Sequence, residues 1–466
     1  MNFQVVLLWS DALLFVLITV IAGLALWARR QEALRAAWSR VAGNAVAMAA
    51  ATVLAVFVLV GLLDSLHYRA RLEAQSGAQG VATARYAVEV SSALDALLAG
   101  LRQHAETTYS APLATHLYSR EALENSTQRE FPRLKHGGAH LGENLAGHEF
   151  DIALRVSRGL GGGLVAWLLL ATLWCRARGL ELAATLRAGA GDAATSAATG
   201  AVLITLLAIF LLLGVAVALG GGYHVFGTDK VGQDVLYLAL KSIRTGLLIG
   251  TLTTLVMLPV AVLLGIMAGY VGGWVDDLIQ YLYTTLSSIP GVLLIAAAVL
   301  MMQVVIDTHP DWFATSAERA DARLLALCLI LGMTSWTGVA RLLRGETLKL
   351  RELEFVQAAQ AFGVGRFAIM RRHILPNLMH IVLISLVMDF SGLVLAEAVL
   401  SYVGVGVDPT TISFGTMINT ARMELAREPM VWWSLLAAFS FMFALVLAAN
   451  LFADAVRDAF DPRSSA

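Results

Sequence analysis

The sequence predicts an all-α, polytopic membrane protein with about nine transmembrane helices. Of its 466 residues, 58% are hydrophobic and only 14% are charged, whereas soluble domains carry roughly 25% charged residues. The mean hydropathy is +0.72, and apolar runs recur at about the 20-residue length that crosses the hydrocarbon core of a bilayer. A net charge of -1 gives no broad basic surface, so nucleic acid is not an expected partner.

The first apolar run resembles a signal peptide in length but not in its flanks. Its leader "MNFQ" has no Lys or Arg, and Arg29 and Arg30 follow the run. This order favours a retained helix with its N-terminus outside. The nine expected spans are residues 7–27, 44–63, 159–175, 200–220, 244–270, 277–304, 322–340, 378–402 and 431–453.

Basic residues in the short loops support the same orientation. With the N-terminus outside and the C-terminus in the cytoplasm, the proposed cytoplasmic loops hold 16 Lys and Arg, against 7 in the short external loops. Cytoplasmic loops carry the excess of Lys and Arg, while long segments translocate largely regardless of charge. The long segment 64–158 is therefore left out of the count, and the orientation places it outside the membrane.

That long segment is the one sizeable soluble part of the chain. In "YAVEVSSALDALLAGLRQHA", apolar residues recur at helical spacing from Val90 to Leu101, which predicts an amphipathic helix. The small, polar stretch 187–200 is typical of a flexible linker. We therefore expect an N-terminal addition with three transmembrane helices, residues 1–190, and a six-helix core, residues 200–463.

Prolines and glycines punctuate the expected core spans. Pro259 and Pro290 lie within spans, where the ring and the missing N–H kink a helix. Gly265 and Gly269 form a pair four residues apart, a spacing that lets a neighbouring helix approach closely. We interpret all four as packing features.

No motif predicts a catalytic centre or a cofactor. The chain has no Gly-Lys pair and so no phosphate-binding loop, and "HEFDI" has Ile152 where a zinc helix needs a second His. Six of ten histidines fall in the segment 64–158, where "HGGAH" sets His136 and His140 four apart. Two interpretations remain open, an external metal site and solvated surface histidines.

Two acidic residues lie inside the expected span 378–402. Asp389 and Glu397 are eight residues apart and so near one face of a helix. Charged side chains are costly in a membrane and often mark substrate paths. They are candidates for a translocation path, or for hydrogen bonds between helices, and the sequence leaves both open.

A polar island, residues 355–377, separates two apolar runs. Arg366, Arg371 and Arg372 would each cost about 2.5 to 3.5 kcal/mol at the bilayer centre, so the island lies outside the hydrocarbon. Helix formers predict a helix at Glu354–Phe362, and Gly363 with Gly365 predicts a turn. A second short helix, 366–373, follows, and Pro376 is expected to end it.

The first of these helices has a side of small residues, which suits close docking in a groove on another protein. The residues are Ala358, Ala359 and Ala361. No nucleophile, base or metal ligand set accompanies them. The island is therefore expected to make a mechanical contact.

Here the chain resembles a known family. The stretch "VQAAQAFGVGRFAIMRRHILPN" resembles the EAA loop of ABC-importer permeases, in the branch that carries peptides and nickel. Four more motifs resemble that branch in the same order: "GTDKVGQDVL", "AGYVGGWVDDLI", "AEAVLSYVGVGVDP" and "FADAVRDAFDPR". The similarity covers roughly residues 200–463.

The resemblance implies one transmembrane subunit of an ATP-driven importer for di- or oligopeptides, located in the bacterial inner membrane. It implies a second related permease, cytoplasmic ATPase subunits and an external substrate-binding protein, so this chain is not expected to be an enzyme. The loop 345–377 would couple the chain to the ATPases. The positions carried over for coupling are Glu354, Gln357, Ala358, Ala359, Gly363 and Arg366.

Three positions depart from the family pattern. Gln357 stands where the motif has Glu, His373 where it has Ile, and Gln233 where this branch often has Arg. The first puts a specific ion pair at position 357 in doubt. Residues 1–190 have no counterpart in the usual core, so the resemblance says nothing about them.

Two alternative functions are kept. A permease for nickel or a metal chelate would fit the breadth of the family and the external histidines. An ion-coupled secondary transporter acting alone would fit the acidic residues within the spans, but it would not need the polar island.

Overall fold

The structure, a computed structural model, describes residues 3–28, 30–71, 86–122, 129–142, 147–182, 185, 194–313 and 315–460. The chain divides into two compact units. Unit 1 comprises residues 1–7, 28–245 and 412–455, and unit 2 comprises residues 8–27, 246–411 and 456–466. Of the expected linker, 187–200, residues 187–193 lie outside the described residues. Residues 194–200 form the first turns of helix α8 (Ala194–Gly220), so the prediction of a flexible linker is wrong for that half.

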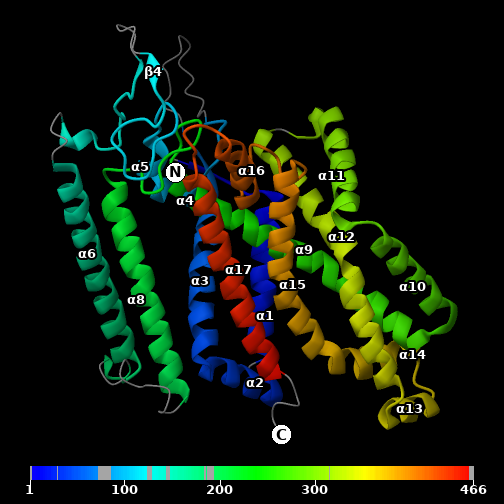
Figure 1. The fold of residues 1–466 in the computed structure, drawn as a ribbon. Helices are drawn as coiled ribbons and strands as arrows, with labels where there is room; N and C mark the ends of the chain where they lie inside the picture. Colours follow the sequence, from blue (N-terminus) through cyan, green and yellow to red (C-terminus); the bar gives the residue numbers. More distant parts are fainter. Residues whose placement is uncertain are drawn as a thin grey trace, which may run out of the picture. The chain divides into compact units, whose positions relative to one another are not determined.

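Long apolar helices dominate both units, which confirms the all-α, polytopic fold (Figure 1). Among the described residues, eight helices are long and apolar enough to cross a membrane, and α1 adds a shorter apolar stretch, Trp9–Gly23. The helices that meet the expected spans are α1 (Trp9–Ala28), α3 (Ala45–Ser65), α6 (His148–Ala177), α8 (Ala194–Gly220), α9 (Val235–Val271), α11 (Gly291–Thr308), α12 (Ser316–Arg351), α15 (Leu375–Val403) and α17 (Trp433–Phe460).

One expected span is wrong as a single helix. Residues 277–304 contain the end of α10 (Gly273–Ser288) and most of α11, with Ile289 and Pro290 between them. Ile289 is extended, as the residue before a proline prefers, and Pro290 caps α11. Pro290 therefore separates two helices, whereas Pro259 remains inside α9.

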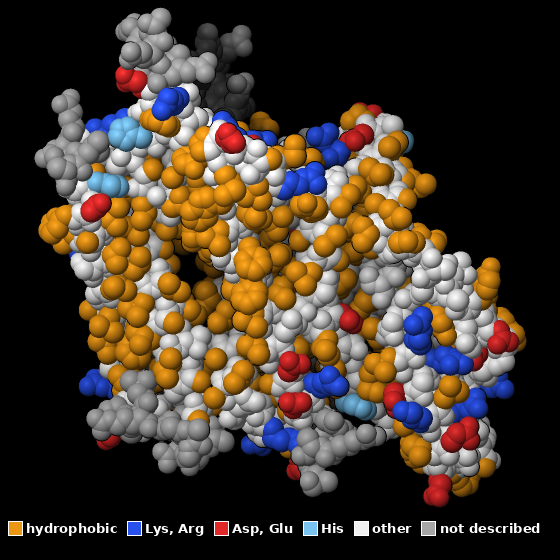
Figure 2. Space-filling view, in the orientation of Figure 1, with side chains coloured by type: hydrophobic (Ala, Val, Ile, Leu, Met, Phe, Trp, Pro, Cys, Tyr) orange, Lys and Arg blue, Asp and Glu red, His pale blue; other side chains and the backbone are white. Residues whose placement is uncertain are grey.

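In unit 1, α6 and α8 form a closely packed pair of antiparallel helices (Figure 1). A Cβ atom added to Gly159 of α6 would lie 2.6 Å from the carbonyl oxygen of Gly214 in α8, and one added to Gly163 would lie 2.4 Å from that of Phe210. Only glycine permits this approach. In Figure 2, hydrophobic side chains cover much of the surface of α6 and α8, and no charged side chain is seen on that face at the middle of the two helices, as is expected of lipid-facing helices.

In unit 2, α9 packs tightly on α12. Cβ atoms added to Gly265 and Gly269 would lie 2.8 Å from the carbonyl oxygens of Ala340 and Arg344 respectively. The predicted close approach at this glycine pair is confirmed. Around it lies an apolar core that α9, α10, α12 and α15 share.

The segment after α3 is folded and compact where the structure describes it. Two short helices, α4 (Ala93–Leu97) and α5 (Ala99–Gln103), replace the one amphipathic helix that was predicted. Leu94 is buried but Leu97 is 72% exposed, because the helix breaks at Leu98. Short strands complete this part: β1 (Phe3–Val6), β2 (His67–Ala70) and β3 (Ser91–Ser92) form one antiparallel sheet, and β4 (Glu121–Ala122) pairs with β5 (Arg129–Glu130).

Candidate functional site

The polar island follows directly from the end of α12. Two residues separate the end of α12 at Arg351 from a short helix, α13 (Glu354–Ala361). It ends with two main-chain hydrogen bonds, from Val364 N to Ala359 O and from Gly363 N to Gln360 O, while Gly363 has a φ of +75°. This pattern is a Schellman cap, in which a left-handed glycine satisfies the last carbonyls of a helix. The predicted turn at Gly363 is confirmed.

After the turn, the chain enters a helix without a further break. Helix α14 (Arg366–Ile369) continues through a π-helical turn, η4 (Met370–Ile374), into α15. The prediction that Pro376 ends the second helix is wrong. Pro376 lies at the start of α15, where the wider π turn before it accommodates a residue that has no N–H to donate. We call residues 353–374 the bracket.

One side of the bracket is buried against its own chain. Val356, Ile369 and Ile374 are fully buried and Ala359 is 8% exposed, all in one core cluster with Tyr270 of α9. Ala359 was expected on the docking side together with Ala358. The structure places its side chain inward instead, because the helices after the turn pack back against that face of α13.

The opposite side of the bracket is exposed and carries aromatic side chains. Phe362 is 87% exposed, Phe367 is 70% exposed and Phe355 is 43% exposed. Large apolar residues seldom gather on a free surface without a partner to cover them. Of the positions proposed for coupling, Glu354, Gln357, Ala358, Gly363 and Arg366 are exposed.

The departure at position 357 leaves the bracket intact. Gln357 is exposed, and its Nε2 donates to the main-chain oxygen of Glu352, 3.1 Å away. His373, at the other departure, lies beside Phe355 with ring centroids 6.2 Å apart.

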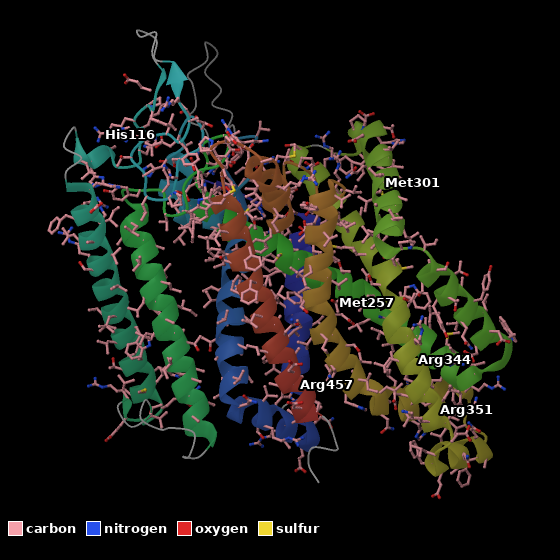
Figure 3. All side chains as sticks on the ribbon, viewed as in Figure 1. His116, Met257, Met301, Arg344, Arg351 and Arg457 are labelled. Carbon is pink, nitrogen blue, oxygen red and sulfur yellow. The ribbon has the colours of Figure 1, made fainter. Side chains whose placement is uncertain are left out.

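An ion pair fixes α10 to the last turns of α12, close to the bracket. Figure 3 labels its arginine, Arg344 of α12. Arg344 donates two hydrogen bonds to the Asp276 carboxylate, at 2.6 and 2.7 Å. This two-point contact is the strong geometry for arginine and carboxylate, and it holds the pKa of Asp276 below its usual range. Sequence reasoning missed the pair. Asp276 lies in the quoted motif "AGYVGGWVDDLI", but nothing in the sequence singled out Arg344 as its partner.

The two acidic residues of α15 differ in their surroundings. Glu397 is 2% exposed, and its Oε1 accepts a hydrogen bond from Ser401 Oγ at 2.7 Å. Asp389 has a buried Oδ2 atom with no hydrogen-bond partner among the described residues. An unpaired carboxylate oxygen is the costlier arrangement, so Asp389 is the stronger candidate for a polar path.

A buried polar cluster in unit 1 joins the segment after α3 to the loop before α9. We call Glu106, His224 and Asp234 the Glu106 cluster. His224 Nδ1 lies 2.8 Å from Asp234 Oδ2, and its Nε2 lies 3.4 Å from Glu106 Oε1. Three main-chain N–H groups, of residues 135–137, also donate to Glu106.

Hydrogen bonding dominates the protonation of this cluster. Burial raises the pKa of Glu106, but the hydrogen bonds from His224 and the main chain outweigh it, and the pKa falls to about 2. Burial lowers the pKa of His224, but its bonds to Asp234 and Glu106 outweigh this effect, and the pKa rises to about 9. Near neutral pH, His224 therefore carries a positive charge and Glu106 a negative one.

The glycines of "GTDKVGQDVL" allow the close approach of this segment. A Cβ atom on Gly232 would lie 1.9 Å from the main-chain oxygen of Glu106, and one on Gly227 would lie 2.3 Å from that of Ser110. Both glycines have positive φ. The main chain of the motif thus packs directly against residues 106–110, which are far from it in the sequence.

A second ion cluster fixes the first turns of α9 in unit 1. The ammonium of Lys241 lies 2.8 Å from Asp95 of α4 and 3.1 Å from Asp64 of α3. Burial raises the pKa of Asp95, but the charge and hydrogen bond of Lys241 outweigh it, and the pKa falls to about 2. One lysine therefore links α9 to both acids.

The histidines of "HGGAH" have partners other than a metal. His136 stacks on His104 with ring centroids 4.8 Å apart, and His140 Nε2 lies 2.7 Å from Asp151 Oδ2. In the part of the chain that the structure describes, no group of three or more His, Cys, Asp or Glu could hold a metal ion.

Comparison with known proteins identifies the family. The profile of the family described as binding-protein-dependent transport system inner membrane component matches residues 261–466. The oligopeptide transport system permease protein OppC of Mycobacterium tuberculosis is 31% identical over 244 residues, which cover 52% of this chain and 77% of that protein. This chain belongs to that family of transport permeases. The permease is therefore a multi-pass inner-membrane protein.

Other relatives of the permease are named for related cargoes. The dipeptide transport system permease protein DppC of Lactococcus lactis is 30% identical over 242 residues, 52% of this chain and 64% of the relative. The glutathione transport system permease protein GsiD of Pectobacterium atrosepticum is 31% identical over 242 residues, 52% of this chain and 73% of the relative. The three names give oligopeptides, dipeptides and glutathione as the cargoes of those proteins.

Proposed function

We propose that this permease is one transmembrane subunit of an ATP-driven importer that carries di- or oligopeptides across the inner membrane. The names of the relatives, all peptide permeases, support the cargo. The bracket supports transport driven by separate ATPase subunits. Its inner side is packed against its own chain, while its outer side exposes aromatic side chains to a partner. A nickel permease is not favoured by these relatives, and an ion-coupled transporter acting alone would have no use for such a surface.

The partners would be a second permease, cytoplasmic ATPase subunits and an external substrate-binding protein. ATP hydrolysis is assigned to partner subunits, since the chain has no phosphate-binding loop. With the N-terminus outside and the C-terminus in the cytoplasm, the bracket faces the ATPases. The residues 1–190 then form an addition to a core at 200–463.

The bracket would carry force between the ATPases and the core. Its inner side packs into the cluster that includes residues of α9, α12 and α15, so a displacement of α13 would be passed to three spanning helices. A partner that binds the bracket more tightly in one state of the core shifts the equilibrium towards that state. The exposed contact positions would be Glu354, Gln357, Ala358 and Arg366, together with Phe362 and Phe367.

Asp389 is proposed to line the translocation path. Its unpaired Oδ2 atom supports this role, while the burial of Glu397 and its bond from Ser401 favour packing. Asp389→Asn is expected to change peptide uptake with assembly intact, and Glu397→Gln is expected to change stability. If Asp389→Asn alters only the yield of assembled complex, Asp389 is a packing residue.

Isolation of the complex tests the proposed function directly. A tagged full-length permease would be purified from its native membrane, and the bound proteins and cargo would be identified by mass spectrometry. The proposal expects ATPase subunits, a second permease and peptide bound to the external protein. Recovery of the chain alone in a transport-competent state, or of nickel as the cargo, would contradict it.

A further inference from the structure

Unit 1 contains an apolar groove that the proposed function does not use. It has a volume of about 510 Å³ and lies between the start of α3, the start of α8 and the later turns of α17. Figure 2 shows a hollow in the hydrophobic surface between α8 and α3. Five of its eleven lining residues are alanines, so the width of the groove comes from small side chains on three neighbouring helices.

The lining excludes a polar occupant. Its one hydroxyl, of Thr205, already donates to the main-chain oxygen of Ala201 at 2.8 Å. All three helices are among those long and apolar enough to cross a membrane, and the family is an inner-membrane family. The surrounding medium of the groove is therefore lipid hydrocarbon, and an acyl chain matches its chemistry.

Helix α2 (Glu32–Gly43) lies at one end of the groove. It contacts both α3 and α8, and its apolar side chains Ala37 and Val41 are buried. The turn into α3 is fixed by Asn44, whose Oδ1 accepts from the N–H groups of Val46 and Ala47. The first lining residue, Ala45, follows this turn at once.

The exposed face of α2 is basic and aromatic. Arg35 and Arg40 are exposed, Trp38 is 41% exposed, and residues 28–43 hold four Arg against one Glu. Asp454 of α17 is also exposed. With this acidic residue counted, the net charge at the α2 end of the groove is still positive. Basic amphipathic helices bind anionic lipid head groups, and tryptophan favours the head-group level.

We propose that this groove binds an acyl chain of an anionic phospholipid, whose head group lies against the basic exposed face of α2. A helix of the second permease is the competing occupant. Two walls of the groove, α3 and α8, lie outside residues 261–466, which the family profile matches. An interface shared by the family would not be built mainly from residues outside that match.

Photo-crosslinking in nanodiscs tests the site. The probe is phosphatidylglycerol with a diazirine in its acyl chain, compared with the matching phosphatidylcholine, and labelled peptides of the full-length chain are mapped by mass spectrometry. We expect phosphatidylglycerol to label the peptides of the groove preferentially. Filling the groove with Ala49→Leu and Ala201→Leu should reduce that labelling about tenfold, the equivalent of about two displaced methylene groups.

Substitution of the two exposed arginines of α2 tests the contact with the head group. Arg35→Gln and Arg40→Gln should each reduce the preference for phosphatidylglycerol about fivefold. Two substitutions serve as matched controls: Ala55→Leu, at an exposed position of α3 outside the groove, and Arg158→Gln, at an exposed position of α6. Both should label as the wild type does. The arginine variants also decide the case if the filled groove prevents folding, since their side chains are exposed.

Three results would overturn the proposal. Labelling of the groove that is unchanged by Ala49→Leu and Ala201→Leu would show that the chain does not enter it. Equal labelling of the wild type by the two lipids would show that the groove has no preference for an anionic head group. A crosslink from the groove to another protein of the assembled complex, in place of lipid, would make the groove a protein interface.

Discussion

The bracket and the Glu106 cluster are both polar regions, but they differ in how far their side chains are buried and bonded within the chain. In the bracket, Phe362 and Phe367 are 87% and 70% exposed, while the side chains of Glu106 and His224 are 1% and 4% exposed and bonded to one another and to the main chain. The first region has a surface that needs a partner, and the second is satisfied within the chain. Substitutions in the cluster should therefore act on stability, and substitutions on the bracket should act on coupling.

The largest effect is expected from breaking the Glu106 cluster. Glu106→Gln removes one negative charge beside His224 and leaves a buried, partly compensated cation. Removal of one partner from a buried ion pair costs about 3 to 5 kcal/mol. Thermal unfolding in detergent, followed by tryptophan fluorescence, measures the loss. Glu89→Gln is the control, since the Glu89 side chain is 74% exposed, and an equal loss in both variants would contradict the comparison.

A pH titration should give the next largest effect. The pKa of His224 is about 9 in the fold against 6.5 ordinarily, so its contribution is fully present below pH 6.5 and is lost as the pH rises through 9. The shift corresponds to about 3 kcal/mol. We expect the melting temperature to fall between pH 6.5 and pH 9.5 in the wild type, and to fall less in His224→Gln. Equal slopes in the two proteins would contradict this assignment.

Glu106 should make the melting temperature fall at the acidic end of the same pH titration. Its pKa is about 2 in the fold against 4.5 ordinarily, so its contribution is present above pH 4.5 and is lost as the pH falls through 2. The bracket has no comparable buried cluster among its described residues, so variants of its exposed face should keep the wild-type profile.

Backbone strain at Gly363 gives a smaller effect on stability. A Cβ atom there would meet open space, so Gly363→Ala costs only the left-handed conformation, about 1 to 2 kcal/mol. Gly363→Asn should cost less, because asparagine tolerates that conformation. Transport in proteoliposomes should fall in the alanine variant and be kept in the asparagine variant. Full activity in both would show that coupling does not depend on the turn.

The sequence predicts the parts of the molecule that local patterns determine. Apolar runs predict the spanning helices, the spacing of Gly265 and Gly269 predicts the close contact of α9, and Gly363 predicts the turn after α13. The motif "VQAAQAFGVGRFAIMRRHILPN" predicts the family. Each of these follows from residues within a few turns of one another.

Other features depend on contacts that the sequence does not reveal. The inward direction of Ala359 follows from the return of the chain after the turn, and Pro376 was misjudged because a π turn precedes it. Glu106 and His224 are 118 residues apart, and Arg344 is 68 residues from Asp276. No periodicity connects such pairs, and one sequence shows no covariation.

The central claim is that the exposed aromatic face of the bracket couples ATP hydrolysis to transport. The most direct measurement is the number of peptides imported per ATP hydrolysed in proteoliposomes that contain the assembled complex. Phe362→Ser and Phe367→Ser should each change stability by no more than about 0.5 kcal/mol and lower this ratio severely. Trp312→Ser, at a 63% exposed aromatic residue outside the bracket, should leave the ratio unchanged. A wild-type ratio in the bracket variants would contradict the claim.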